Sequence, residues 1–258
     1  SAVPPWLARL VENAAGLKAT DLRSAQAPPH GGRRSAVLIL FGEGPQGPDV
    51  LLIERSRESR RHAGQPAFPG GAAEPDDDGP ASTAVREATE ETGLDPAGVD
   101  VLAQLSALWL APSGFLVVPV LAWWREPCAV RPADPAEVAA VARVPIAALV
   151  EPANRFRLRH RSGYLGPAFD VGDLLVWGFT AGLLDRLLDA GGLARPWNRA
   201  DVREPPPEVL AVNPHGKIPV LTDGEFALPE SNAILWYVAE THPDSGLVPR
   251  NDGSRAEL

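Results

Sequence analysis

The feature that most restricts the fold of this chain is a set of acidic residues spaced for one face of a helix. Glu87, Glu90 and Glu91 lie at i, i+3 and i+4, so a helix would bring their carboxylates together within one turn. Such charges repel one another unless a cation is shared, and hard divalent cations prefer carboxylate oxygens. The pattern therefore predicts a helix over 81–92, ended by Gly93, that binds Mg²⁺ or Mn²⁺. Taken alone, E-x-x-E-E also fits a solvated acidic helix face.

Two glycines precede this helix within a long segment that has no periodicity. Gly70 and Gly71 lack a Cβ, so the backbone there can approach a metal ion or a phosphate closely. Residues 57–80 are rich in Gly, Pro and Asp, and a loop of this length is usually functional or disordered. Arg86 can pair with an acidic side chain and orient the helix. We therefore expect Gly71 to join the three glutamates as a metal ligand, and Arg86 to join them in the catalytic set.

The whole run from 70 to 94 resembles the signature of the Nudix hydrolases, which cleave nucleoside diphosphates linked to another moiety. The resemblance rests on Gly-Gly followed by R-E-x-x-E-E-x-G and an apolar residue, here Arg86 to Leu94. The family spacing G-x5-E-x7-R-E is one residue longer here, with Asp77 in place of Glu. The role of Asp77, or of its neighbours Asp76 and Asp78, stays open. The resemblance implies an α/β class fold, an α/β/α sandwich with a mixed sheet.

The segment before this signature narrows the resemblance to one branch of the family. Residues 51–71, LLIERSRESRRHAGQPAFPGG, are similar to the motif L-L-T-x-R-S-x-x-L-R-x-H-x-G-Q-x-x-F-P-G-G of coenzyme A pyrophosphatases, with Ser59 in place of Leu. That branch also tends to carry the longer box with Asp. Residues 111–120, 152–156 and 177–181 resemble later segments of the family.

Basic residues gather in this segment although the chain is acidic overall. With 24 Lys and Arg against 33 Asp and Glu, the net charge of −9 excludes nucleic-acid binding through overall positive charge. Arginine often binds phosphate with two parallel hydrogen bonds, and coenzyme A carries a 3′-phosphate and a diphosphate. Each arginine could equally be solvated or pair with Glu54 or Glu58, and the histidine and glutamine could anchor the loop. The expected substrate-binding residues are Arg55, Arg57, Arg60, Arg61, His62, Gln65 and Gly70.

The resemblance also implies a reaction. Divalent cations held by the glutamates would polarise a phosphorus and lower the pKa of bound water. Coenzyme A would then yield 4′-phosphopantetheine and 3′,5′-ADP. Glu87 and Glu137 are both candidates for the general base, although a solvated loop position is the simpler interpretation of Glu137. Phe156, Tyr164 and Trp177 are expected in the core or at the rim of the site rather than stacked on adenine.

The composition of the chain changes at about Arg195. A proline-rich stretch precedes two strand-like runs, 217–223 and 224–230, and a helix-like run from Ser231 to Thr241. Residues 203–248 resemble the second half of the thioredoxin-like domain of glutathione S-transferases, which implies a partial ββα segment. The glutathione-site remnant would be Ile218, Pro219, Glu230 and Ser231. The first strand of that family is not recognisable, so we expect no glutathione transferase activity. A fusion remnant, an artificial join and a docking appendage stay open as explanations.

These patterns predict two parts, a Nudix domain over 1–195 and a partial glutathione S-transferase-like segment over 196–258. One cysteine, Cys128, excludes a disulfide framework, and the apolar runs are too short to span a membrane. No signal peptide opens the sequence as given, so we expect a cytoplasmic protein without membrane contact. Its partner would be a small-molecule diphosphate, and a homodimer is left open. The alternatives are another substrate, such as a dinucleotide or ADP-sugar, or a glutathione-binding or interaction protein with the Nudix part as scaffold.

Local periodicity also predicts individual elements of the first part. We expect an antiparallel hairpin of two strands near 35–41 and 50–56, because two apolar runs flank a Gly- and Pro-rich turn. The other expected elements are a short helix around Trp6–Val11, strands at Val101–Trp109 and Phe115–Trp124, and an amphipathic helix at Leu174–Leu188.

Overall fold

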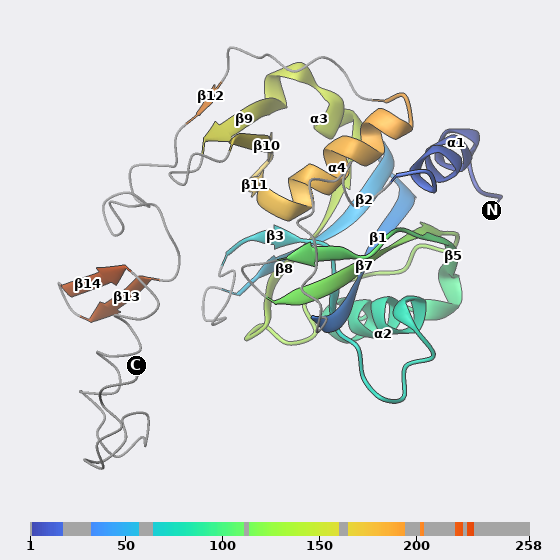
Figure 1. Ribbon diagram of the computed structural model, residues 1–258. Helices are drawn as coiled ribbons and strands as arrows, with labels where there is room; N and C mark the ends of the chain where they lie inside the picture. The colour runs from blue at the N-terminus through green and yellow to red at the C-terminus, as the bar shows by residue number, and fades with distance from the viewer. Residues whose placement is uncertain are drawn as a thin grey trace. The chain divides into compact units, whose positions relative to one another are not determined.

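The computed structural model divides the chain into two compact units (Figure 1). The first unit comprises Ser1–Arg157 with Gly166–Asp201, and the second comprises Leu158–Leu165 with Val202–Leu258. The residues that the structure describes are 2–17, 32–56, 64–110, 114–159, 165–193, 202–203, 220–223 and 226–229.

The expected hairpin forms the centre of the first unit. Strands β1 (Arg33–Gly44) and β2 (Gly47–Arg55) pair antiparallel, with Phe41 opposite Val50. Gly47 closes the turn with φ of 93°, a value that side chains with a Cβ rarely adopt. The prediction of a hairpin is therefore confirmed, and the strands are longer than their apolar runs.

A mixed sheet is built around this hairpin. Among the described residues it has eight strands, with the order β3-β2-β1-β7-β5, while β4 pairs with β1, β6 with β7 and β8 with β2. Strands β1 and β7 are parallel, and the other strand pairs of this sheet are antiparallel. The remaining strands of the sheet are β3 (Pro66–Ala67), β4 (Gly70–Ala72), β5 (Val99–Gln104), β6 (Leu108–Leu110), β7 (Phe115–Trp124) and β8 (Val138–Pro145).

Helices cover both faces of this sheet (Figure 1). Successive residues of β1 face opposite sides, so Leu38 and Leu40 pack toward α2 while Ile39 and Phe41 pack toward α1 and α4. A strand buried on both faces must be apolar throughout, which explains the unbroken hydrophobic run in β1. The helices are α1 (Pro5–Ala14), α2 (Pro80–Thr92), α3 (Ile146–Val150) and α4 (Gly178–Ala190). The α/β/α sandwich expected from the sequence is confirmed.

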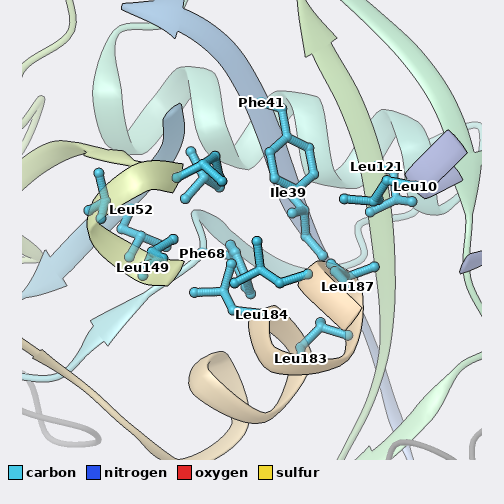
Figure 2. Packing of buried hydrophobic residues seen from close by; sticks show 14 of the residues in the cluster. Leu10, Ile39, Phe41, Leu52, Phe68, Leu121, Leu149, Leu183, Leu184 and Leu187 are labelled. Atoms are coloured by element: carbon cyan, nitrogen blue, oxygen red, sulfur yellow. The ribbon is translucent and has the colours of Figure 1, made fainter. Parts of the chain in front are cut away.

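The larger core lies between the sheet and the layer that contains α4. Leu183, Leu184 and Leu187 of α4 belong to one buried cluster with Ile39 and Phe41 of β1 (Figure 2). Leu10 of α1 belongs to the same cluster, and the Asn13 side chain donates a 2.7 Å hydrogen bond to the carbonyl oxygen of Ala190 at the end of α4. The two terminal helices of this unit are thereby joined over one face of the sheet.

Three of the expected elements differ from those observed. The helix expected over 174–188 begins at Gly178, because Leu174–Val176 form strand β11, paired antiparallel with β10 (Leu165–Val171). The strand expected over 101–109 is interrupted between β5 and β6. Residues 66–67 and 70–72, within the segment 57–80 that was expected to be a loop, form β3 and β4. The short strands β11, β3 and β4 each form by pairing with another strand, β10, β2 and β1 respectively, and this pairing overrides the local pattern.

A second sheet has the order β11-β10-β9, where β9 is Arg155–Arg159. In the second unit, β12 is Val202–Arg203, while β13 (Val220–Asp223) and β14 (Phe226–Pro229) pair antiparallel with Val220 opposite Pro229. These last strands fall within the two runs predicted at 217–223 and 224–230. The expected helix after residue 230 lies outside the described residues.

A helix must be long and apolar to span a membrane. Over the described residues, no helix is both long enough and apolar enough to cross a membrane.

Candidate active site

The acidic helix forms where the sequence predicts it. Helix α2 spans Pro80–Thr92 and ends at Gly93, which adopts the left-handed conformation with φ of 70°. Ala84 and Ala88 pack against the sheet, and their small size lets the helix lie close to β1. The acidic side chains point past this contact toward the turn that precedes the helix.

Gly71 brings that turn against the helix. It lies in β4 opposite Ala36 of β1, and a Cβ built on Gly71 would lie 2.3 Å from the carboxylate carbon of Glu87. No side chain can fit in that space without moving Glu87. The absence of a Cβ at Gly71 therefore allows the Glu87 carboxylate to reach the edge of the sheet.

Glu91 is the most deeply placed of the three glutamates. Its side chain is 7 % exposed, and its Oε2 accepts a 2.8 Å hydrogen bond from the backbone N–H of Gly70. Its Oε1 lies 3.6 Å from Nη2 of Arg55, the last residue of β2. The same Nη2 donates to the carbonyl oxygen of Gly70 at 3.3 Å. Gly70, Glu91 and Arg55 therefore form one cluster.

Burial raises the pKa of both inward-facing glutamates. The pKa of Glu91 rises to about 7, chiefly because burial disfavours its charged form, although Arg55 and the Gly70 N–H lower it in part. The charges of Glu87 and Glu137 raise it further. Burial also raises the pKa of Glu87, and Arg86 opposes that shift. A buried carboxylate with a raised pKa is stabilised by an additional cation, so this pair is suited to hold one.

Arg86 holds the remaining acidic groups together. Its Nε and Nη2 lie 3.0 and 3.1 Å from the two carboxylate oxygens of Asp77, and Nη2 also donates to the carbonyl oxygen of Ala72 at 3.0 Å. Its Nη1 lies 3.1 Å from a carboxylate oxygen of Glu87 and 3.1 Å from one of Glu90. Arg86 therefore positions the helix carboxylates relative to the preceding loop.

Asp77 is the acidic loop residue that the lengthened box left undefined. Its side chain is 5 % exposed and accepts hydrogen bonds from Thr83 Oγ1 at 2.8 Å and from the Glu74 backbone N–H at 2.9 Å. The Arg86 guanidinium and these donors hold the pKa of Asp77 well below its usual range. Asp76 and Asp78 are exposed. The extra residue in the loop is therefore accommodated while Asp77 still reaches Arg86.

The chemistry of these donors fits a hard divalent cation. The carboxylates of Glu87, Glu90 and Glu91 and the carbonyl oxygen of Gly70 are oxygen ligands of the type that Mg²⁺ and Mn²⁺ prefer. Within the described residues, no three or more His, Cys, Asp or Glu side chains are already grouped so that they could hold a metal. The positive charges beside these carboxylates come instead from Arg55 and Arg86. The Gly70 N–H binds Glu91 and the Gly70 carbonyl oxygen binds Arg55, whereas Gly71 provides the space for Glu87.

The expected substrate loop starts and ends beside this cluster. The Arg55 backbone accepts a 2.9 Å hydrogen bond from the Gly64 N–H and donates a 3.2 Å bond to the Gln65 carbonyl oxygen. Of the expected substrate-binding residues, Arg55, Gln65 and Gly70 are described. Arg57, Arg60, Arg61 and His62 lie outside the described residues, as do Ile218, Pro219, Glu230 and Ser231 of the expected glutathione-site remnant.

Glu137 lies closer to the site than its sequence position indicates. The next residue, Val138, pairs with Arg55 in the sheet, and the Glu137 carbonyl oxygen accepts a 2.9 Å hydrogen bond from the Ser56 N–H. Its side chain is exposed, and its charge raises the pKa of Glu91. Strand β8 supplies this placement, and a prediction of β8 from the sequence would have indicated it.

Two of the three aromatic residues considered for adenine stacking are described. Phe156 is 2 % exposed in the core, as expected, and Trp177 lies half-buried directly before α4. Tyr164 lies outside the described residues.

The fold places an acidic helix beside a pair of glycines in a mixed α/β/α sandwich. A family model described as the NUDIX domain matches residues 32–165, which is more than half of the chain, and the chain therefore belongs to the Nudix family. Nudix hydrolases in general use divalent metals such as Mg²⁺ or Mn²⁺ and act on small-molecule diphosphates.

The chain is also similar to individual proteins and to one solved structure. The chain is 39 % identical over 164 residues to Nudix hydrolase 15, mitochondrial, of Arabidopsis thaliana, and covers 57 % of that protein with 60 % of its own length. It is 35 % identical over 162 residues to a protein named uncharacterized Nudix hydrolase NudL from Photorhabdus laumondii, covering 83 % of that protein and 60 % of this chain. A Nudix hydrolase structure from M. smegmatis has 22 % identity and a TM-score of 0.46, covering 66 % of this chain and 91 % of that one.

The C-terminal segment matches a second family. A model described as the glutathione S-transferase N-terminal domain matches residues 186–246, which begin within α4 and include β13 and β14. The segment is thus similar to that domain over a longer stretch than 203–248.

Proposed function

We propose that this chain is a Mg²⁺- or Mn²⁺-dependent pyrophosphatase that hydrolyses coenzyme A or its derivatives to 4′-phosphopantetheine and 3′,5′-ADP. The observation that carries the proposal is the placement of two carboxylates, half-buried Glu87 and buried Glu91, against Gly70 and Gly71. Burying such charges is costly unless a cation accompanies them, and a divalent cation is what binds a diphosphate. Membership of the Nudix family supports the chemistry, and the motif over 51–71 supports the substrate.

Separate residues of the chain would bind the metal, position its ligands and act as the general base. Glu87, Glu90 and Glu91, with a backbone carbonyl oxygen of Gly71 or of neighbouring Gly70, would hold the metal, which would polarise the phosphorus and lower the pKa of bound water. Arg86 keeps Glu87 and Glu90 in place. Two residues remain candidates for the general base. Glu87 lies against Gly71, and the charge of Glu137 acts on Glu91.

The substrate assignment rests on the basic loop. Ser56 and Gly64, which flank residues 57–63 in the sequence, both lie next to the sheet: the Ser56 N–H binds the Glu137 carbonyl oxygen and the Gly64 N–H binds the Arg55 carbonyl oxygen. We propose that Arg57, Arg60 and Arg61, together with His62, bind phosphate groups of the substrate beside the glutamates. Two phosphate groups at opposite ends of 3′,5′-ADP would require several separate cations, which this loop supplies.

Product analysis tests the proposal directly. The protein is incubated with coenzyme A and Mg²⁺, and the products are identified by mass spectrometry beside Glu90→Gln and the matched surface variant Glu126→Gln. We expect both products from the wild type and from Glu126→Gln, and a loss of at least about 100-fold in Glu90→Gln. If a dinucleotide or ADP-sugar reacts and coenzyme A does not, the substrate assignment is wrong while the chemistry stands.

The organisation of the whole chain is a further part of the proposal. We propose a catalytic domain over 1–195 and a glutathione S-transferase-like segment over 196–258 that lacks transferase activity. The single cysteine agrees with a reducing compartment, so a cytoplasmic location is proposed. The observation that supports the alternative function, glutathione binding with the Nudix part as scaffold, is the match over 186–246. Calorimetric titration with glutathione separates the two, since binding without turnover of any diphosphate supports the alternative.

A further inference from the structure

The two oxygens of the Glu91 carboxylate have different partners. Oε2 accepts a 2.8 Å hydrogen bond from the Gly70 backbone N–H, which is fixed because Gly70 lies in β4, paired with β1. Oε1 faces Nη2 of Arg55 at 3.6 Å, and this partner belongs to a long side chain that is 30 % exposed. One partner is therefore permanent, while the other can move away without any change in the backbone.

The Arg55 nitrogen lies where two prospective metal ligands converge. Nη2 is 3.3 Å from the Gly70 carbonyl oxygen as well as 3.6 Å from Glu91 Oε1. A cation that takes both oxygens must displace this nitrogen. The Arg55 backbone cannot follow, because its N–H and carbonyl are bound to Gln65 and Gly64 in the described structure. Only the guanidinium group can move.

We propose that Arg55 is the resident counter-cation of Glu91, which a divalent metal ion must displace in order to bind. This inference rests on the proposed function, and it gives Arg55 a role that phosphate binding alone does not. The guanidinium neutralises the buried carboxylate while no metal is bound, and it opposes metal binding by charge repulsion and by occupying the two oxygens. Arg55 is thus a positioning residue that weakens metal affinity.

The expected effect has a sign that a purely structural role would not produce. Replacing Arg55 with Gln removes the competing charge and should tighten metal binding by about tenfold. Coulomb's law gives a factor of this size for a single and a double positive charge roughly 6 Å apart in a water-like medium. A residue that merely supported the site would weaken metal binding when replaced.

The test is a titration with Mn²⁺ in the absence of substrate, in which electron paramagnetic resonance measures Mn²⁺ binding. The full-length wild type is compared with Arg55→Gln, with Arg55→Lys and with the matched control Arg125→Gln. Gly71 pairs with Ala36 of β1, and Ala36 pairs with Val118 of β7. Arg125 directly follows the end of β7, so at ~3.3 Å per residue its charge lies about 20 Å along the sheet from Val118. A thermal melt of each variant verifies that it is folded.

We expect tighter Mn²⁺ binding only in Arg55→Gln, with Arg55→Lys and Arg125→Gln within about threefold of the wild type. Unchanged or weaker binding in folded Arg55→Gln would overturn the inference. Equal tightening in Arg55→Lys would also overturn it, because the positive charge would then have no effect. If the wild type binds no Mn²⁺, the proposed function itself is wrong, which distinguishes the two failures.

Discussion

At the scale of single residues, the site depends on what Gly71 lacks. Its position against Glu87 leaves no room for a Cβ, which would lie 2.3 Å from the carboxylate carbon. Gly71→Ala is therefore expected to displace Glu87 and to lower kcat/KM for coenzyme A by about 100-fold or more. Steady-state kinetics at saturating Mg²⁺ would measure the loss.

Gly182 provides the control for this substitution. It lies inside α4, and a Cβ there would meet nothing within 4 Å. Gly182→Ala should keep full activity and raise the free energy of unfolding by about 0.5–1 kcal/mol, because alanine restricts the unfolded chain more than glycine does. Equal loss of activity in both variants would show that the effect of Gly71→Ala is not local.

The Asp77 carboxylate makes the stability of the folded protein depend on pH. Its pKa lies well below the ordinary value of 3.8, so the ionised form is favoured in the folded state. The stability it contributes is fully present well above pH 3.8 and is lost as the pH falls below that value. Asp77→Asn should lower Tm at pH 7 by about 3–6 °C, and the difference from the wild type should narrow at pH 3.

Thermal melts at pH 7, 5 and 3 would measure this narrowing, with exposed Asp78→Asn as a control expected to stay within about 1 °C of the wild type. A difference that is independent of pH would mean that the carboxylate charge of Asp77 does not stabilise the loop.

At the scale of elements, α4 completes the larger core. Leu184 is fully buried in the cluster that joins α4 to the sheet (Figure 2). Leu184→Ala should lower the free energy of unfolding by about 2–5 kcal/mol, because it removes buried methyl groups and leaves a cavity. Urea denaturation would measure this change, and Val101→Ala, at a side chain 43 % exposed, should cost less than about 0.5 kcal/mol.

Some elements follow from local sequence and others do not. The β1–β2 hairpin and helix α2 were predictable, because a Gly- and Pro-rich turn and a one-turn carboxylate spacing act between near neighbours in sequence. Strand β11 was not, since Leu174 to Val176 fit a helical period as well as a strand. Antiparallel pairing with β10, the strand that directly precedes it, decides between the two.

At the scale of the whole molecule, metal binding and stability should be coupled. A ligand that binds only the folded state stabilises it by about 2.7 kcal/mol at 100 times its Kd. Mn²⁺ at that concentration should therefore raise the Tm of the wild type by about 5 °C, and a chelator should reverse the rise and abolish activity. Differential scanning fluorimetry would measure both melts.

Two variants test whether the rise in Tm comes from Mn²⁺ bound at the proposed site. Glu91→Gln removes a proposed ligand and should show little rise in Tm with Mn²⁺. Glu126→Gln, which lies just beyond the end of β7, should behave as the wild type. A similar rise in both variants would indicate that Mn²⁺ binds elsewhere on the protein.

The sequence by itself determined the acidic helix, the glycine turn and the family, because these depend on residues that are close along the chain. Only the tertiary structure decided which groups meet the carboxylates. Arg55 reaches Glu91 from the end of β2, and Glu137 approaches it because β8 pairs with β2. These contacts join segments far apart in sequence, and strand order, which no local pattern encodes, brings them together.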